Sequence, residues 1–147
     1  MRMHTKHGHS LVELLLGITV AGTMTATAIP AVSTMTAHAH VNQAAVTVSH
    51  DLMVAVSNAA RERKPIRIDL SPNHQAITFT DRTSGTLLST RFLGRSDVYA
   101  LDSASFSTAP VDVLPTGLTS SALTVTLWSQ GYSRQVTMSL AGWVRVP

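Results

Sequence analysis

The N-terminal stretch carries the strongest hydrophobic pattern in the chain. From Leu14 to Val32, nineteen residues follow one another without a charged side chain. A helix of about 20 apolar residues spans the roughly 30 Å hydrocarbon core of a membrane. The segment before it, Met1 to Gly8, carries Arg2 and Lys6, and positive charge of this kind favours an N-terminus on the cytoplasmic side. The pattern therefore predicts a membrane-inserted helix.

One carboxylate, Glu13, stands at the start of this apolar run. An ionised group in a membrane segment costs about 2.5–3.5 kcal/mol on insertion scales, so such a residue usually has a function. Two interpretations remain open: a secretory signal peptide cut near Ala26-Thr27-Ala28, or a permanent anchor cut before the hydrophobic run. Glu13 and the length of the run, beyond the roughly 7–15 residues of a signal peptide, favour the second.

After Val32 the helical period continues, but only one face stays apolar. Apolar residues recur at spacings of three and four, as in an amphipathic helix: Val41, Ala45, Val48, Leu52 and Ala59. The basic residues Arg61, Arg63 and Lys64 suit a helix C-terminus, and Pro65 ends the helix. A helix over 9–63 is about 80 Å long. Within its first half, Gly22 and Pro30 predict a kink.

From Pro65 onward the apolar period becomes two, as in half-exposed strands. Turn residues at 71–74 and 129–133 predict two hairpins. The strands expected from the alternation are 66–70, 77–79, 86–93, 98–101, 111–113, 123–128, 135–140 and 143–146. The chain therefore predicts an α+β fold, with one long helix followed by a small antiparallel sheet.

Composition removes several classes of function. The chain has no cysteine, so thiol catalysis and thiolate metal sites are excluded. The histidines at 38, 40, 50 and 74 lack partners at metal-ligand spacing, and no nucleophile elbow or phosphate-binding loop is present. We expect no catalytic residue, no metal and no cofactor. The formal charge of +3 falls to +1 without Arg2 and Lys6, which leaves 9 basic and 8 acidic residues.

The stretch from Gly8 to Leu14, Gly-His-Ser-Leu-Val-Glu-Leu, resembles the type III signal sequence of type IV prepilins and type II secretion pseudopilins. In that family a prepilin peptidase cuts after the glycine, here Gly8, and N-methylates the new first residue, here His9. The family's key glutamate matches Glu13, and its helix-kinking proline matches Pro30. His9 departs from the usual phenylalanine.

The resemblance implies a role for Glu13 in recruiting subunits. In a bundle of packed helices, the carboxylate of one subunit can meet the N-terminal ammonium of its neighbour. Two charges in an apolar bundle each carry a desolvation cost unless they are paired. We therefore expect Glu13 to pair with the amine of a neighbouring His9.

The C-terminal half is similar to the GspH/FimT group of minor pilins and pseudopilins. The similarity lies in Val113-Leu-Pro-Thr-Gly117, a following hairpin, and a final Gly142-Trp143-Val144-Arg145. Members usually end on a pattern like Gly-Arg-x-Arg, so Trp143 replaces one arginine. The expected division is a leader at 1–8, a hydrophobic transmembrane or filament helix at 9–36, an amphipathic continuation at 37–63, and a β-sheet domain at 64–147.

The resemblance implies a minor pilin or pseudopilin, a structural subunit of a type IV pilus or a type II secretion pseudopilus. Its partners would be the prepilin peptidase, other subunits through the N-terminal helix, and the inner membrane before assembly. The protein would cross that membrane once, with its C-terminal domain outside the cytoplasm, and then enter the fibre. A membrane-anchored or secreted domain of another activity remains the alternative from a different class.

A second alternative is a DNA-binding minor pilin for natural transformation. Arg134 and Arg145 could line one edge of the C-terminal sheet, with Trp128, Tyr132 and Trp143 nearby in sequence. Arginines beside aromatic rings can bind DNA through phosphates and stacking. The opposing interpretation places the tryptophans in the core and the arginines on a solvated face.

Overall fold

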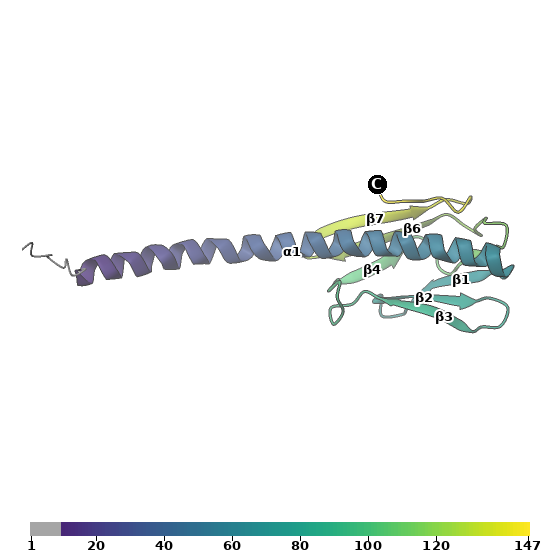
Figure 1. The fold of residues 1–147 in the computed structure, drawn as a ribbon, viewed down its shortest axis with the longest axis horizontal. Coiled ribbons are helices and arrows are strands. Elements are labelled where there is room, and N and C mark those ends of the chain that lie inside the picture. The colour runs from purple at the N-terminus through teal and green to yellow at the C-terminus, as the bar shows by residue number, and fades with distance from the viewer. Residues whose placement is uncertain (1–9) are drawn as a thin grey trace, which may run out of the picture. The chain divides into compact units, whose positions relative to one another are not determined.

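The computed structural model describes residues 10–147, except for the side chains of residues 25–31. The chain divides into two compact units, Met1–Met35 and Thr36–Pro147. Helix α1 (Leu11–Glu62) supplies the described part of the first unit and continues into the second. All the strands that the structure describes lie in the second unit (Figure 1).

The predicted long helix is confirmed as α1 and ends one residue earlier than expected. Arg63 follows it in the left-handed region (φ 54°), a common way to close a helix C-terminus. Pro65 then begins the extended chain. The described residues, which leave out the side chains of 25–31, contain no helix long and apolar enough to cross a membrane. The transmembrane span predicted over 9–36 stays a prediction.

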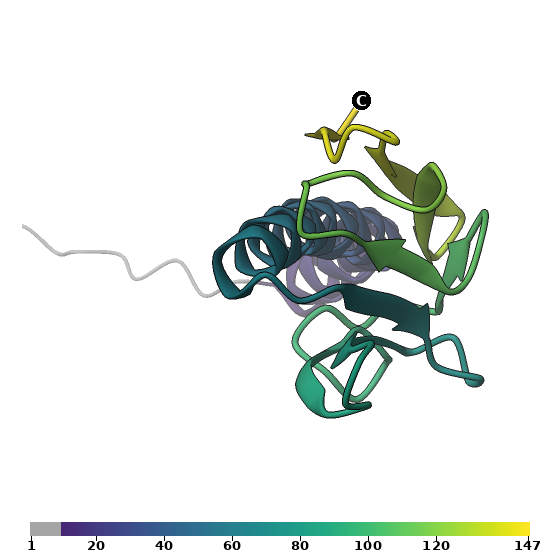
Figure 2. The same ribbon diagram turned by 90° about the vertical axis from the view of Figure 1, so that its right-hand side faces the viewer.

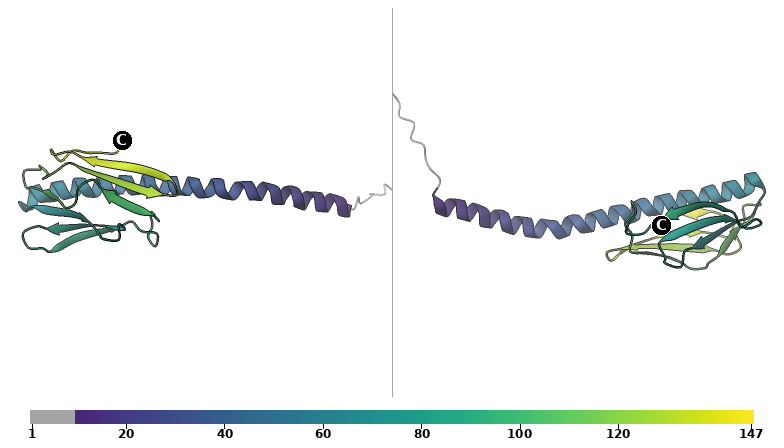
Figure 3. Two further views of the ribbon diagram at one scale, coloured as in Figure 1. Left: turned by 180° about the vertical axis from the view of Figure 1, so that it is seen from behind. Right: turned by 90° about the horizontal axis from the view of Figure 1, so that it is seen from below.

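The strands form two four-stranded antiparallel sheets, whereas the sequence predicted one. The first sheet has the order β3 (Leu87–Phe92), β2 (Ala76–Asp81), β1 (Ile66–Leu70), β5 (Val111–Val113). The second has the order β4 (Ser103–Phe106), β6 (Leu123–Ser129), β7 (Tyr132–Met138), β8 (Val144–Arg145). Figure 3 shows both sheets from behind and from below.

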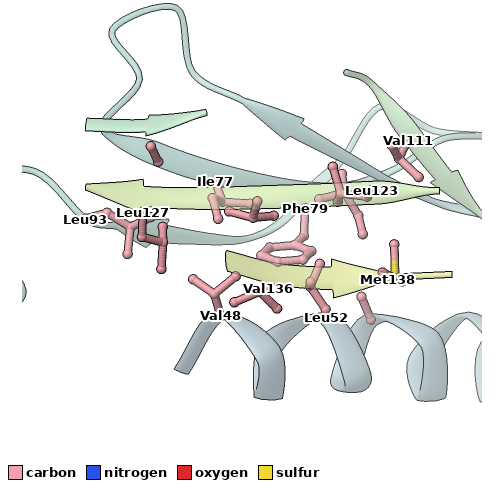
Figure 4. Close-up of a cluster of buried hydrophobic side chains, with 14 of the residues drawn as sticks. Val48, Leu52, Ile77, Phe79, Leu93, Val111, Leu123, Leu127, Val136 and Met138 are labelled. Carbon is pink, nitrogen blue, oxygen red and sulfur yellow. The ribbon is translucent and has the colours of Figure 1, made fainter. Parts of the chain in front are cut away.

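The core of the second unit lies between α1 and the inner faces of both sheets (Figure 2). Val48 and Leu52 of α1 face Phe79 of the first sheet and Val136 and Met138 of the second (Figure 4). All five side chains are at most 4% exposed. Burying a side chain of this size contributes about 1.5–3 kcal/mol, so this shared core holds the two sheets on one helix.

The strand expected at 98–101 is wrong, and β4 lies at 103–106 instead. Val98 is 73% exposed in a turn, whereas Leu101 is 1% exposed and its N–H donates to the carbonyl of Leu93 (3.1 Å). The Tyr99 hydroxyl donates to Thr47 Oγ1 of α1 (3.1 Å). Leu101 lies in the core and Tyr99 packs against it, whereas Val98 does not, so the apolar residues of this stretch do not follow a strand period.

The hairpin of β6 and β7 is confirmed with a tighter turn than predicted. Ser129 pairs with Tyr132, which leaves only Gln130 and Gly131 between the strands. Both have positive φ, 48° and 82°, as a two-residue turn of this hand requires. β7 therefore begins at Tyr132 rather than 135, and it ends at Met138 because Ser139 enters the next turn.

Candidate assembly surface

The start of α1 carries the residues predicted for processing and assembly. Gly8 and His9 lie outside the described residues, so cleavage and N-methylation stay predictions. Ser10 precedes the helix, and its hydroxyl accepts from the Glu13 N–H (3.3 Å), while its carbonyl accepts from the Leu14 N–H (3.2 Å). Serine before the helix with glutamate at its third position is the capping-box pattern, which the sequence interpretation missed.

Glu13 is exposed in the first turn of α1. The positive end of the helix dipole favours a carboxylate at this position. Its side chain lines an open groove together with Leu14, Gly17, Ile18 and Ala21. The groove therefore places one charged group among apolar side chains.

The helix around Glu13 is apolar on every side. Large apolar side chains that are 50–78% exposed follow one another along it: Leu11, Val12, Leu14, Leu15, Leu16, Ile18 and Val20. A helix with this surface is normally buried in protein or membrane. A Cβ on Gly17 would meet no atom within 4 Å, and small residues of this kind let neighbouring helices approach closely. The first unit therefore presents a packing surface.

Gly22 and Pro30 both lie within α1. The Thr19 and Thr23 hydroxyls donate to the carbonyls of Leu16 and Val20, each at 2.9 Å. Threonine hydroxyls within helices commonly bond back to the preceding turn in this way. The kink expected at Gly22 and Pro30 stays a prediction.

The two arginines predicted for DNA lie on opposite faces of the second sheet. Arg134 follows the buried alternation of β7, on the inner face with Val136, and its Nε is buried without a hydrogen-bond partner. Arg145 pairs with Thr137, which alternates with the buried positions and so lies on the outer face. The structure therefore does not bring these two charges together.

Of the three aromatic residues near them, Tyr132 lies apart from the two tryptophans. Tyr132 faces α1, where its ring stacks on His38 (centroids 4.0 Å apart) and its hydroxyl donates to Asn42 Oδ1 (3.3 Å). Trp128 and Trp143 are 48% and 71% exposed. The expectation that the tryptophans are core residues is wrong, because both point away from the packed interior.

The two C-terminal segments that carry the family resemblance contact each other. The turn at 113–117 is closed by the Gly117 N–H, which donates to the Leu114 carbonyl (2.9 Å). A Cβ on Gly142 would collide with the carbonyl oxygen of Gly117 and reach Val56 of α1 at 3.4 Å. Gly142 also has φ 73°, which favours glycine. The turn between β7 and β8 thus packs by its backbone on the turn after β5.

Ion pairs between distant segments were not predicted. Arg91 of β3 donates from Nε and Nη2 to the carboxylate of Asp51 on α1 (2.6 and 3.0 Å), and this raises the pKa of Arg91. Asp112 of β5 accepts from Arg67 Nε (2.9 Å) and lies 3.3 Å from Arg82 Nε. Partners 30 to 45 residues apart leave no local sequence signal.

Two further carboxylates organise turns. The N–H of Gln130 and the side chain of Arg95 both donate to Asp102, and they lower its pKa. Asp81 accepts from the Thr83 N–H (2.7 Å), which lowers its pKa, and lies 3.6 Å from Lys64 Nζ. Ion pairs and carboxylate hydrogen bonds of this kind stabilise the second unit, which has no disulfide.

Comparison with known proteins assigns this architecture. The family described as Type II transport protein GspH matches residues 44–142. The type IV minor pilin FimU of Pseudomonas aeruginosa has a similar structure (TM-score 0.62, 18% identity), over 75% of this chain and 90% of that chain. The minor pseudopilin EpsH from the Type 2 Secretion System of Vibrio cholerae is also similar (0.57, 16%), over 74% and 96%. No curated protein sequence matches the chain.

Proposed function

The chain belongs to the GspH family and is a minor pilin or pseudopilin, and we propose that it works as a non-enzymatic subunit of a fibre. The observation that carries this proposal is the N-terminal part of α1, which exposes large apolar side chains on every side. Packing against the same helices of other subunits would bury that surface. FimU is a type IV minor pilin and EpsH a minor pseudopilin of a secretion system, so genes beside this one should identify the fibre.

Processing is the first step of the proposed pathway. A prepilin peptidase cuts after Gly8 and N-methylates His9, and the motif from Gly8 to Leu14 supports this. Mass spectrometry of the mature protein tests it: a chain that starts at His9, with a mass 14 Da higher if methylated, is the expected result (about one CH₂ group). A chain that starts near Thr27 or Ile29 would show a secretory signal peptide and contradict the proposal.

The apolar run supports membrane insertion before assembly. Residues 14–32 carry no charge, and the basic leader favours a single crossing with the C-terminal domain outside the cytoplasm. The prepilin then sits in the inner membrane until its helix moves into the fibre. Cell fractionation should recover the unassembled protein with inner membranes, and protease added from the periplasmic side should digest its C-terminal domain.

Within the fibre, Glu13 pairs with the N-terminal amine of a neighbouring subunit. After cleavage that amine belongs to His9, two residues before the start of α1 at Leu11. Glu13 also has a capping position with Ser10, so a substitution must separate the charge from the cap. Glutamine at position 13 keeps the capping-box pattern and removes the charge, whereas Ser10→Ala removes the cap and keeps the charge.

Glu13→Gln should be cleaved normally but enter fibres at least about tenfold less. Without the carboxylate, the neighbour's N-terminal ammonium would be buried unpaired, which costs about 3–5 kcal/mol. Ser10→Ala should enter fibres at close to the normal level and lose only about 1 kcal/mol of helix stability. Immunoblots of sheared fibres and of whole cells measure both. Normal incorporation of Glu13→Gln would show that the carboxylate serves the helix cap alone.

DNA binding is the second candidate function. The observation that favours it is the sequence after Asp112, which has no acidic residue but contains Arg134 and Arg145. Because these arginines lie on opposite faces, one DNA strand would contact one of them. A gel shift of residues 37–147 should then respond to Arg145→Ala and not to Arg134→Ala. Equal binding by both variants and the parent, or no binding at all, would remove this function.

A further inference from the structure

Both tryptophans of the chain lie on one face of the second sheet. The chain contains two, and Trp128 is 48% exposed at the end of β6, on the face opposite the buried Leu127. Trp143 is 71% exposed and shares an open hollow with Thr124, Thr137 and Arg145. Tryptophan exposed to this extent is typical of binding surfaces, because its large ring gains most when a partner covers it.

The surface between the two rings carries hydroxyl and amide side chains and no acid. Residues on the outer face of β6 and β7 alternate with the buried positions of those strands, and those between the rings are Thr124, Thr126, Gln135 and Thr137. The hollow beside Trp143 has a volume of about 590 Å³. Trp128 lies four residues along β6 from Thr124, which corresponds to about 13 Å. A ligand that covers both rings must therefore be extended.

We propose that this outer face binds a linear carbohydrate chain, a role beyond that of a fibre subunit. Flat sugar rings present C–H faces that pack on indole rings. Their hydroxyl groups exchange hydrogen bonds with threonine hydroxyls and a glutamine amide, which both donate and accept. Arg145, at the Trp143 end, has no carboxylate partner among the described residues and can receive the carboxylate of an acidic sugar.

The composition of the face argues against the two other macromolecules. DNA, the second candidate above, would find only Arg145 on this face, whereas DNA binding usually depends on several cations that neutralise successive phosphates, so a carbohydrate fits the face better. A protein interface has an apolar centre and a polar rim, whereas here hydroxyl and amide groups occupy the centre and aromatic rings the ends. Aromatic platforms separated by hydrogen-bonding groups match an alternation of sugar faces and sugar hydroxyls.

The test uses the full chain in a zwitterionic detergent, because detergents with sugar headgroups would compete. The probes are cellohexaose, chitohexaose, the hexamer of galacturonate, and a 12-nucleotide single-stranded DNA. Since both tryptophans lie on the proposed site, their fluorescence reports binding without a label, and calorimetry gives the affinity. The variants are Trp128→Ala, Trp143→Ala, the double variant and Arg145→Ala. Phe92→Ala removes a ring that is 60% exposed on the other sheet and serves as the matched control.

At least one hexasaccharide should shift the fluorescence and bind. Each tryptophan substitution should weaken binding by about tenfold, the effect of losing one aromatic contact of roughly 1.4 kcal/mol, and Phe92→Ala should leave it unchanged. Arg145→Ala should weaken binding of the galacturonate hexamer more than that of the neutral sugars. Circular dichroism melts confirm that these surface variants are folded.

Three results would overturn the proposal. The first is that no hexasaccharide binds at millimolar concentration while the protein is folded. The second is binding that survives the double tryptophan variant. The third is binding of the DNA, but of none of the sugars, to a site that the tryptophan substitutions remove, which would make this face a nucleic-acid surface.

Discussion

The two ends of α1 belong to the same helix, but they differ in how far their apolar side chains are exposed. In the first unit, side chains such as Leu15 and Ile18 are 56% and 63% exposed, and apolar residues cover the whole circumference. In the second, one face of the helix carries apolar residues such as Leu52 that are fully buried under the two sheets. The second half of the helix buries one face within the chain, whereas the described side chains of the first half stay exposed, as the proposed packing against other subunits requires. Under the proposed function, fold stability and assembly therefore depend on different turns of one helix.

The largest expected difference between the two regions comes from shortening one leucine in each. Leu52→Ala should lower the free energy of unfolding by about 2–5 kcal/mol, because it opens a cavity in the core. Leu15→Ala should change it by less than about 0.5 kcal/mol, since exposed positions contribute little. Urea unfolding followed by circular dichroism measures both. Similar losses for the two variants would show that the N-terminal part of α1 packs within its own chain.

Glycine provides a second, smaller contrast. Gly142→Ala should cost about 1–3 kcal/mol, because the residue has positive φ and its Cβ would meet the Gly117 carbonyl. Gly17→Ala meets no atom and should instead stabilise the helix by about 0.5–1 kcal/mol. Thermal melts of the two variants compare them directly. A Gly142→Ala protein as stable as the parent would contradict the close packing of the two turns.

Lowering the pH should have the smallest effect of the three changes, and it acts on the second unit through its carboxylates. Hydrogen bonds lower the pKa of Asp81 in the folded state. The stability that this carboxylate contributes is therefore complete above its pKa in the unfolded chain, about 4, and is lost as the pH falls through its lower pKa in the folded state. Asp81→Asn should therefore lower Tm most near pH 7, with the difference shrinking below about pH 4. Asp97→Asn, at a carboxylate without an ion pair among the described residues, is the control. A Tm difference that stays constant from pH 7 to pH 2 would contradict this assignment.

The sequence predicted the features that depend on local pattern. The amphipathic face of α1, the end of the helix before Pro65, and the hairpins of β1–β2 and β6–β7 all follow from periods of 3.6 or two and from turn residues. The division into two sheets depends on long-range pairing, such as β1 with β5, which are about 45 residues apart. No local pattern encodes such a pairing.

The candidate site divides in the same way. The capping box of Ser10 and Glu13 was readable from the spacing, since serine precedes the apolar run and glutamate follows three residues later. The placement of Arg134 and Arg145 on opposite faces needed the register of β7 with β8. The exposure of Trp143 also could not be predicted, because a short edge strand after a glycine turn has too few residues to show a period.

The ion pairs of the second unit have a consequence for where the protein can fold. Disulfides form only in oxidising compartments, but this chain has no thiol to oxidise. The contacts of Asp51 with Arg91 and of Asp112 with Arg67 form as readily on either side of a membrane. The domain therefore needs no oxidase and no disulfide isomerase to reach its fold, and reductants leave its covalent structure unchanged.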